Sequence, residues 1–477
     1  MRIVVVLAFL LTAAIAAWAL WPETQQDEEA IAPNKIQIFT QTINNGMEVV
    51  VVPNDRVPAV SHTLWIRSGA IDEPLGAGGV AHYIEHLMFK GTLNVPEGEY
   101  SKRIVALGGN HNAFTGHDFT GYYVNIAKEH LATVMELEAD RMQRLQPSDT
   151  AFEKELSVIL EERQSRVDTQ PEALFAERVA AKLFVHHPYG RTIIGWRHEM
   201  EQLTAKKAMD FMRNHYTPDN MVVVIAGDVV PEEAFSLARH YYGDLTGKRT
   251  PIVEMAEPPL EGETRFEMQH AQVRQARWMR MWQQPKLGKI EESDPIFARI
   301  LLAEWLGSDR SSYLHRELVV KQKMASHIGV SYSGFSRGPG TFSISAIPAE
   351  GVSVSELENA IDQALLKLTD TFLTDENLAP YKTQQVAEEI FARDSLPGIG
   401  QLMGYMRMYG LSDDYIHNWS RYVNKVSAQS VKSALAELLE TKGSVTAVLL
   451  PEAQPAPPVQ PAPEESVREA VEEEAGL

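Results

Sequence analysis

Two histidines and a glutamate occur with a spacing that suits a metal site. They are His82, Glu85 and His86, within the segment Gly-Gly-Val-Ala-His-Tyr-Ile-Glu-His-Leu-Met-Phe-Lys-Gly-Thr at 78–92. If this segment is helical, His82 and His86 lie one turn apart on one face and can direct two imidazoles at a single ion. Glu85 is then close enough to reach a water held by that ion. Two neutral imidazoles and a carboxylate, with a fourth position for water, form a common catalytic zinc set.

The same letters also fit an amphipathic helix that carries two histidines on its wet side without any metal. The chain holds 15 His and 64 Asp plus Glu among 477 residues, so a chance match is conceivable. The order H-x-x-E-H is the inverse of the H-E-x-x-H motif and is called inverzincin. A catalytic metal site therefore needs support from elsewhere in the chain.

The acidic segment 150–168 is the best source of a third ligand. Thr150 and Glu153 match a capping box, which predicts a helix that begins near Thr150. Glu155 and Glu162 lie seven residues apart and share one helix face across about 10 Å, whereas Glu161 points roughly 100° away from Glu162. Spacing alone leaves Glu161 and Glu162 both open as ligands. A solvated acidic helix face is the alternative for the whole segment.

Length and composition favour a globular protein with more than one domain. The 477 residues are 44% hydrophobic and 23% charged, and they exceed what one ordinary core accommodates. The net charge of −20 argues against a nucleic-acid partner, because phosphate binding needs a basic surface. The absence of cysteine excludes disulfides, Cys-ligated zinc, a cysteine nucleophile and the lipid-attachment cysteine of a bacterial lipoprotein.

The first 35 residues are expected to lie outside the fold. Arg2 precedes an uncharged run from Ile3 to Trp21, and Ala17-Trp18-Ala19 resembles a signal-peptide cleavage site. The same run is long enough to span a bilayer as an uncleaved anchor. We therefore expect a signal peptide or membrane anchor plus a spacer at 1–35. The protein would be exported to a bacterial periplasm, either soluble or anchored to the inner membrane by residues 3–21.

Strands and helices alternate along the remainder of the chain in two similar halves. Strands are predicted at 36–53 (with a turn at Asn44-Asn45-Gly46), 61–67, 111–126, 221–226, 266–282, 330–347 and 444–450. Helices are predicted over the histidine motif and at 99–107, 129–145, from 150, and at 171–184, 205–215, 231–242, 295–306, 309–321 and 353–373. These predict a metal-binding domain at 36–245, a linker at 246–262, a second domain without a metal site at 263–450 and a disordered Pro-rich acidic tail at 451–477.

Five stretches of the first half carry a family resemblance. They are 79–92, Gly-Gly-Asn-His-Asn-Ala-Phe-Thr at 108–115, Glu155-x-x-Val158-x-x-x-Glu162, His187-Pro188-Tyr189-x-x-x-Ile193-x-Gly195 and Val222-x-x-x-x-Ala226-Gly227-Asp228. Together and in this order they resemble the pitrilysin/mitochondrial processing peptidase family of zinc peptidases. The match over 263–450 is weaker.

This resemblance implies both a fold and a site. The fold would be α+β, with two homologous α/β-sandwich domains of antiparallel-rich sheet that form half of a clam shell. One zinc ion would be held by His82, His86 and Glu162, with Glu85 as general base and Glu155 as a supporting carboxylate. Asn112 and Ala113 would lie on an edge strand and pair with an extended peptide substrate. The chain would then be an endopeptidase that cleaves unfolded or extended peptides in an enclosed chamber.

The second half departs from the family pattern. Active members carry an Arg and a Tyr seven residues apart, which help to hold the substrate, and here Val319 and Ser326 stand in register with them. Arg316 and Tyr332 lie nearby at the wrong offset. The chain thus resembles the metal-bearing subunit of a heterodimer whose partner supplies the Arg/Tyr pair. A homodimer or an active monomer is the alternative.

Two other functions are alternatives to the peptidase. One is a non-catalytic binding or assembly subunit, although such family members normally lose the metal motif. The other is a metal-binding protein without hydrolytic activity, and Glu85 argues against it because metal storage needs no general base.

Overall fold

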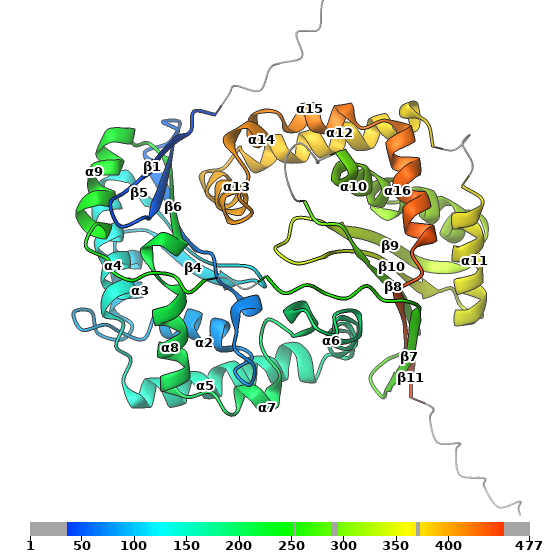
Figure 1. Cartoon of the computed structure of the whole chain (residues 1–477), viewed down its shortest axis with the longest axis horizontal. Helices are drawn as coiled ribbons and strands as arrows, with labels where there is room; N and C mark the ends of the chain where they lie inside the picture. Colours follow the sequence, from blue (N-terminus) through cyan, green and yellow to red (C-terminus); the bar gives the residue numbers. More distant parts are fainter. Residues whose placement is uncertain (1–35, 252–253, 288–293, 369–372, 453–477) are drawn as a thin grey trace, which may run out of the picture.

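Two mixed β-sheets with helices on both faces form the body of the protein, whose fold is α+β as predicted (Figure 1). The computed structural model describes residues 36–251, 254–287, 294–368 and 373–452. The predicted export segment at 1–35 and nearly all of the predicted tail lie outside these residues. Across the described ranges, every helix is too short or too polar to cross a bilayer.

The first sheet has six strands in the order β1-β2-β6-β3-β5-β4. They are β1 (Phe39–Thr42), β2 (Glu48–Pro53), β3 (Ala59–Ile66), β4 (Asn110–Thr115), β5 (Thr120–Ala127) and β6 (Met221–Gly227). Only β2 and β6 pair in parallel; the other neighbours are antiparallel. The predicted turn between β1 and β2 is confirmed, and Gly46 adopts a φ of 93° within it. Strand β4 is an edge of this sheet.

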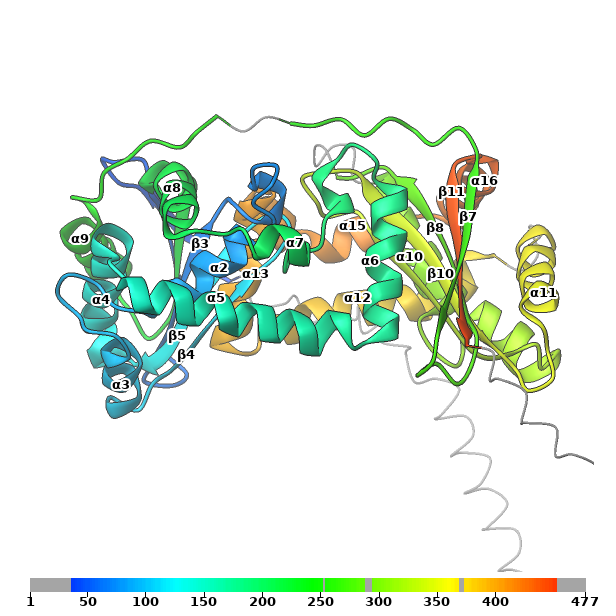
Figure 2. The same ribbon diagram turned by 90° about the horizontal axis from the view of Figure 1, so that it is seen from below.

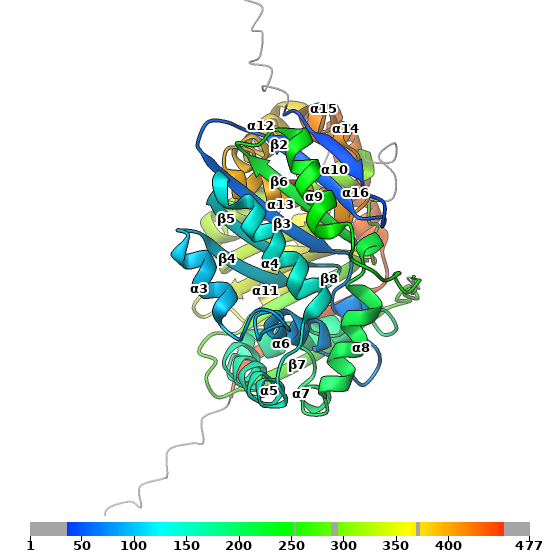
Figure 3. The ribbon, with the colours of Figure 1, turned by 90° about the vertical axis from the view of Figure 1, so that its left-hand side faces the viewer.

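Alternation along β2 explains why both faces of this sheet are covered. Val49 and Val51 point to one face of the sheet and belong to one buried cluster, called the outer core. Val50 and Val52 point to the opposite face and belong to a second buried cluster, called the inner core. In Figure 3, α3, α4 and α9 lie in front of the strands. The helices of the first half are α2 (Val80–Leu87), α3 (Glu99–Ala106), α4 (Leu131–Arg144), α5 (Asp149–Arg163), α6 (Pro171–Leu183), α7 (Arg197–Met200), α8 (Ala205–His215) and α9 (Pro231–Tyr242).

The second sheet repeats the strand order of the first, without a counterpart of β1. Its order is β7-β11-β8-β10-β9. The strands are β7 (Glu263–His270), β8 (Arg277–Gln284), β9 (Ala325–Ser333), β10 (Gly340–Pro348) and β11 (Ser444–Pro451). The last strand runs parallel to β7 and antiparallel to β8, as β6 does between β2 and β3. The strands predicted at 221–226 and 444–450 are confirmed, and they occupy equivalent places in the two sheets.

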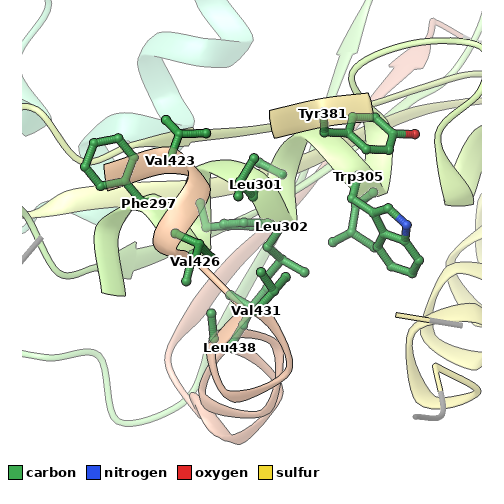
Figure 4. Close-up of a cluster of buried hydrophobic side chains, with 14 of the residues drawn as sticks. Phe297, Leu301, Leu302, Trp305, Tyr381, Val423, Val426, Val431 and Leu438 are labelled. Atoms are coloured by element: carbon green, nitrogen blue, oxygen red, sulfur yellow. The ribbon is translucent and has the colours of Figure 1, made fainter. Parts of the chain in front are cut away.

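Helices of the second half enclose a large apolar core. They are α10 (Asp294–Gly307), α11 (Val354–Leu366), α12 (Asp375–Ala392), α13 (Leu396–Met408), α14 (Asp413–His417), α15 (Trp419–Lys425) and α16 (Ala428–Glu440). Leu301, Leu302 and Trp305 of α10 belong to the same buried cluster as Val423, Val426 and Val431 (Figure 4). Each fully buried side chain of this size contributes about 1.5–3 kcal/mol to folding.

The two halves exchange one helix each. Helix α13, from the second half, packs on β3 and β6 of the first sheet. Helix α6, from the first half, packs on β7, β8 and β11 of the second sheet. Figure 2 shows α6 beside the second sheet, and the connecting segment after α9 crossing from one half to β7. Each sheet thus depends on the other half for part of its cover.

The structure corrects several sequence-based expectations. The predicted capping box at Thr150 and Glu153 is wrong, because α5 begins at Asp149 and Ser148 is its N-cap, accepting a hydrogen bond from the Ala151 N–H at 3.1 Å. The helix predicted at 353–373 ends at Leu366. Only part of 309–321 forms a regular element, a π-helix at His315–Lys321. Helices α12 to α16 were not predicted.

Candidate metal centre

Helix α2 begins at a glycine turn that two carboxylates hold in place. Gly79 is the N-cap, with a φ of 86° that favours glycine. Buried Glu73 accepts hydrogen bonds from the N–H groups of Gly79 and Ala81 at 2.9 and 3.0 Å, and Glu199 accepts from the Gly78 N–H at 2.8 Å. Burial raises the pKa of Glu73 to about 8, against the effect of its N–H donors. These bonds satisfy donors that a helix start leaves unpaired.

The apolar side of α2 fixes which way its histidines point. Ile84 and Leu87 are fully buried in the outer core. The Tyr83 hydroxyl donates to the Phe152 carbonyl at 2.5 Å, which ties α2 to α5. His82 and His86 are therefore directed toward α5.

Three ligand atoms meet between α2 and α5. Glu162 Oε2 lies 3.7 Å from His82 Nε2 and 3.4 Å from His86 Nε2. These residues are the one group of three or more metal-ligating side chains in the described part of the chain whose ligand atoms lie within 4.8 Å of one another. Ligands of a tetrahedral zinc ion, with bonds of about 2.0–2.2 Å, are separated by about 3.3–3.6 Å. The donor set and its spacing fit zinc.

The protonation of His82 also suits a ligand. Burial, with smaller contributions from His86 and Arg166, lowers the pKa of His82 to about 3. Its imidazole is therefore neutral at neutral pH, and a neutral imidazole nitrogen binds metal.

The structure separates the two glutamates that spacing could not distinguish. The side chain of Glu162 is 15% exposed and faces the histidines. Glu161 is exposed and lies outside the ligand group. Glu162 is therefore the residue that the fold brings to His82 and His86.

Glu155 lies where a supporting carboxylate would act. Its Oε2 lies 3.2 Å from His86 Nδ1, and its Oε1 lies 2.6 Å from Lys90 Nζ. Burial opposes ionisation of this carboxyl, but the hydrogen bonds from His86 and Lys90 hold its pKa below the usual value. A carboxylate on Nδ1 orients the imidazole and leaves Nε2 to the metal.

Glu85 projects from the same helix turn as His86 and meets strand β4. The Thr115 hydroxyl donates to Glu85 Oε2 at 2.5 Å. Burial raises the pKa of Glu85, and the Thr115 hydrogen bond and His86 act in the opposite direction. A carboxylate with a raised pKa is a better proton acceptor than an exposed one.

Asn112 and Ala113 lie on strand β4, three and two residues before Thr115. Asn112 is exposed, and its Oδ1 accepts from the Ala113 N–H at 2.9 Å. The strand pairs with β5 on one side and is the edge of the sheet on the other. An edge strand offers unpaired backbone groups to an extended peptide.

At the two positions where the family pattern has Arg and Tyr, the second half of the chain offers neither a guanidinium nor a phenol. Val319 lies in the π-helix and packs against the apolar core. The hydroxyl of Ser326, on β9, donates to the Ile347 carbonyl at 3.3 Å. Tyr332 donates to the Pro285 carbonyl, and Arg316 is exposed.

Four residues around the site were not predicted to take part. Thr115 and Lys90 lie inside the stretches that carry the family resemblance, and Arg166 follows Glu162 by one helical turn. Glu73 precedes the glycine turn, and only the fold shows that its carboxylate caps α2.

Comparisons with known proteins agree with this geometry. Residues 49–196 match the family model described as insulinase (peptidase family M16), and residues 202–385 match the model described as peptidase M16 inactive domain. The zinc protease PqqE of Helicobacter pylori is 30% identical over 365 residues, which is 76% of this chain and 81% of that protein.

Two further likenesses support the same assignment. The mitochondrial-processing peptidase subunit beta of Neurospora crassa is 30% identical over 210 residues, 44% of each chain. The crystal structure of a protease from Helicobacter pylori superposes with a TM-score of 0.81 at 26% identity, covering 87% of this chain and all of that one. The chain belongs to peptidase family M16.

Proposed function

We propose that this protein is a zinc-dependent endopeptidase that cleaves extended or unfolded peptides. The observation that carries the proposal is the meeting of His82 Nε2, His86 Nε2 and Glu162 Oε2 next to Glu85. A zinc ion bound by these three atoms supplies a Lewis acid that polarises the peptide carbonyl and lowers the pKa of water.

Each remaining step belongs to residues of the chain. Glu85 takes a proton from the attacking water and can return it to the leaving amine. Thr115 holds the Glu85 carboxylate through its hydroxyl, and Glu155 holds the His86 ring. The free edge of β4 at Asn112 and Ala113 would align the peptide by β-sheet pairing. We also propose that 36–245 is the catalytic domain, that 246–262 is the linker and that 263–450 is a second domain without a metal site.

A partner subunit is part of this proposal. Val319 and Ser326 offer neither a cation nor a phenol, so the Arg/Tyr pair would come from a second family member in a heterodimer. The relative named subunit beta belongs by its name to a protein of several subunits. Export through residues 3–21 is proposed from the sequence alone.

Peptide cleavage with zinc, with a chelator and after zinc is restored tests the proposal. We expect cleavage that the chelator stops and zinc restores. Glu85→Gln should keep one zinc per chain and lower the cleavage rate by at least about 100-fold, because a positioned general base contributes about 10²–10⁴-fold. A Glu85→Gln protein with full activity would contradict the assignment. Zinc binding without cleavage, alone or with the co-purifying partner, would favour a non-catalytic subunit.

A further inference from the structure

Polar contacts hold the turn that follows α5, next to the candidate metal site. Residues Gln164–Asp168 form a π-helix. Asp168 forms an ion pair with Arg163, whose Nε lies 3.2 Å from Oδ1, and accepts a hydrogen bond from Arg197 Nη1 at 2.9 Å. The Thr169 hydroxyl donates to the Gln164 carbonyl. These contacts fix the backbone around Arg166.

Arg166 presents a guanidinium at the outer side of the ligand carboxylate. Its Nη1 lies 2.6 Å from Glu162 Oε1, while Glu162 Oε2 faces the two histidines. The Arg166 side chain is 73% exposed. A guanidinium has five N–H donors in a planar fork, so contact with one oxygen leaves donors for another acceptor.

The second cation of the site, Lys90, is less accessible to a ligand than Arg166. Lys90 is 25% exposed, and its ammonium is 2.6 Å from Glu155 and 3.9 Å from Glu97. Among the described residues, Arg166 is therefore the exposed cation in contact with the ligand group.

The surrounding charge gives Arg166 a role. Glu85, Glu155 and Glu162 are all acidic, and the chain carries a net charge of −20, which disfavours a peptide carboxylate. Bound zinc and Lys90 would offset part of this charge inside the site, and Arg166 is the exposed cation at its outer side. The family's substrate-holding arginine is replaced here by Val319. Building on the function proposed above, we propose that Arg166 binds a carboxylate of the peptide close to the scissile bond. The site would therefore favour a peptide with a carboxylate at that position over the same peptide without it.

The carboxylate could belong to an Asp or Glu side chain or to the C-terminus of a short peptide. Both present the same planar pair of oxygens, which a guanidinium binds through parallel hydrogen bonds. The two sources are distinguished by peptide design.

Peptide binding to the zinc-loaded Glu85→Gln protein tests the proposal without turnover. The probes are fluorescent decapeptides of Ala and Ser with one Glu moved along the chain, each paired with its Gln counterpart, all amidated. A second pair has no acidic side chain and differs only in a free or amidated C-terminus. Adding Arg166→Gln should weaken binding of the carboxylate member by about 10-fold or more, because hydrogen bonds between charged groups are the strong ones. Its uncharged counterpart should bind as before, and Arg166→Lys should retain part of the preference.

Arg103→Gln is the matched control, because Arg103 forms the same Glu–Arg pair one turn apart, with Glu99 on α3. It should leave all affinities unchanged. Zinc content is measured in every variant at saturating zinc, so that loss of metal is separated from loss of peptide.

Equal weakening of charged and uncharged peptides by Arg166→Gln, or no weakening at all, would overturn the proposal. If Arg166-dependent binding holds but the wild-type chain cleaves nothing, either alone or with its co-purifying partner, the proposed peptidase function fails and this inference stands. If the chain cleaves peptides without any dependence on their carboxylates, this inference fails alone.

Discussion

Glu155 connects the metal helix to α5 through one carboxylate with two partners. One oxygen faces His86 Nδ1 and the other faces Lys90 Nζ. Because His86 would bind zinc through Nε2, the partner on Nδ1 sets the orientation of its ring. We therefore propose that Glu155 affects zinc binding without touching the ion.

We expect Glu155→Gln to weaken zinc binding by about 10–100-fold, the usual effect of removing such a partner. Competition with a chromophoric chelator measures the affinity. Glu153→Gln changes an exposed glutamate of the same helix and should leave the zinc affinity unchanged. An affinity that is unchanged in Glu155→Gln would show that His86 needs no partner.

The first turn of helix α2 is held by two carboxylates from outside the helix. One precedes the helix in the sequence, and the other lies far beyond it. Glu73 accepts from two backbone N–H groups at the helix start, where the positive end of the helix dipole also favours an anion. Burial acts in the opposite direction and raises its pKa to about 8. The hydrogen bonds decide how α2, and with it His82, is placed.

Above pH 8, where the Glu73 carboxyl is ionised, Glu73→Gln is expected to lower the free energy of unfolding by about 1–2 kcal/mol, because the amide can accept at only one oxygen and leaves a buried N–H unpaired. Urea unfolding measures the loss. Glu201→Gln removes a half-exposed partner of Arg197 and should have little effect. Wild-type stability in Glu73→Gln at that pH would mean that α2 does not need the second carboxylate oxygen.

Elements with a local signature could be predicted, and those shaped by distant contacts could not. Strands β7 and β10 alternate in burial, β6 is a wholly apolar run, and α2 follows its glycine turn. Helix α13 contains Gly400 and Gly404, which disfavour a helix in isolation. They are needed because α13 approaches β3 closely: a Cβ on Gly404 would lie 1.9 Å from Trp65 Cε2. Likewise, the spacing of the glutamates along α5 does not tell which of them faces α2.

The exchange of α6 and α13 makes the two halves one structural unit. Trp65 of β3 packs edge-on against Tyr405 of α13, with ring centroids 5.6 Å apart, and Phe119 lies 4.9 Å from the same ring. The first sheet, which carries β4 beside the proposed metal site, therefore relies on packing from the second half. Separating the halves at the linker would expose this surface.

Gly404→Ala should destabilise the protein by about 1–3 kcal/mol, the usual cost of overpacking, because the added methyl meets Trp65. Urea unfolding of the whole chain is the measurement. Gly262→Ala adds the same methyl in open space and should be close to neutral. Equal effects of the two substitutions would contradict the packing of α13 on the first sheet.

The central claim is that His82, His86 and Glu162 together hold one metal ion. Zinc affinity and stoichiometry in Glu162→Gln and Glu161→Gln test it most directly, because these neighbours differ in which way they face. We predict one zinc per chain for the wild type and Glu161→Gln, and an affinity at least about 10-fold weaker for Glu162→Gln. Equal affinities in the two variants, or a loss in Glu161→Gln alone, would contradict the account.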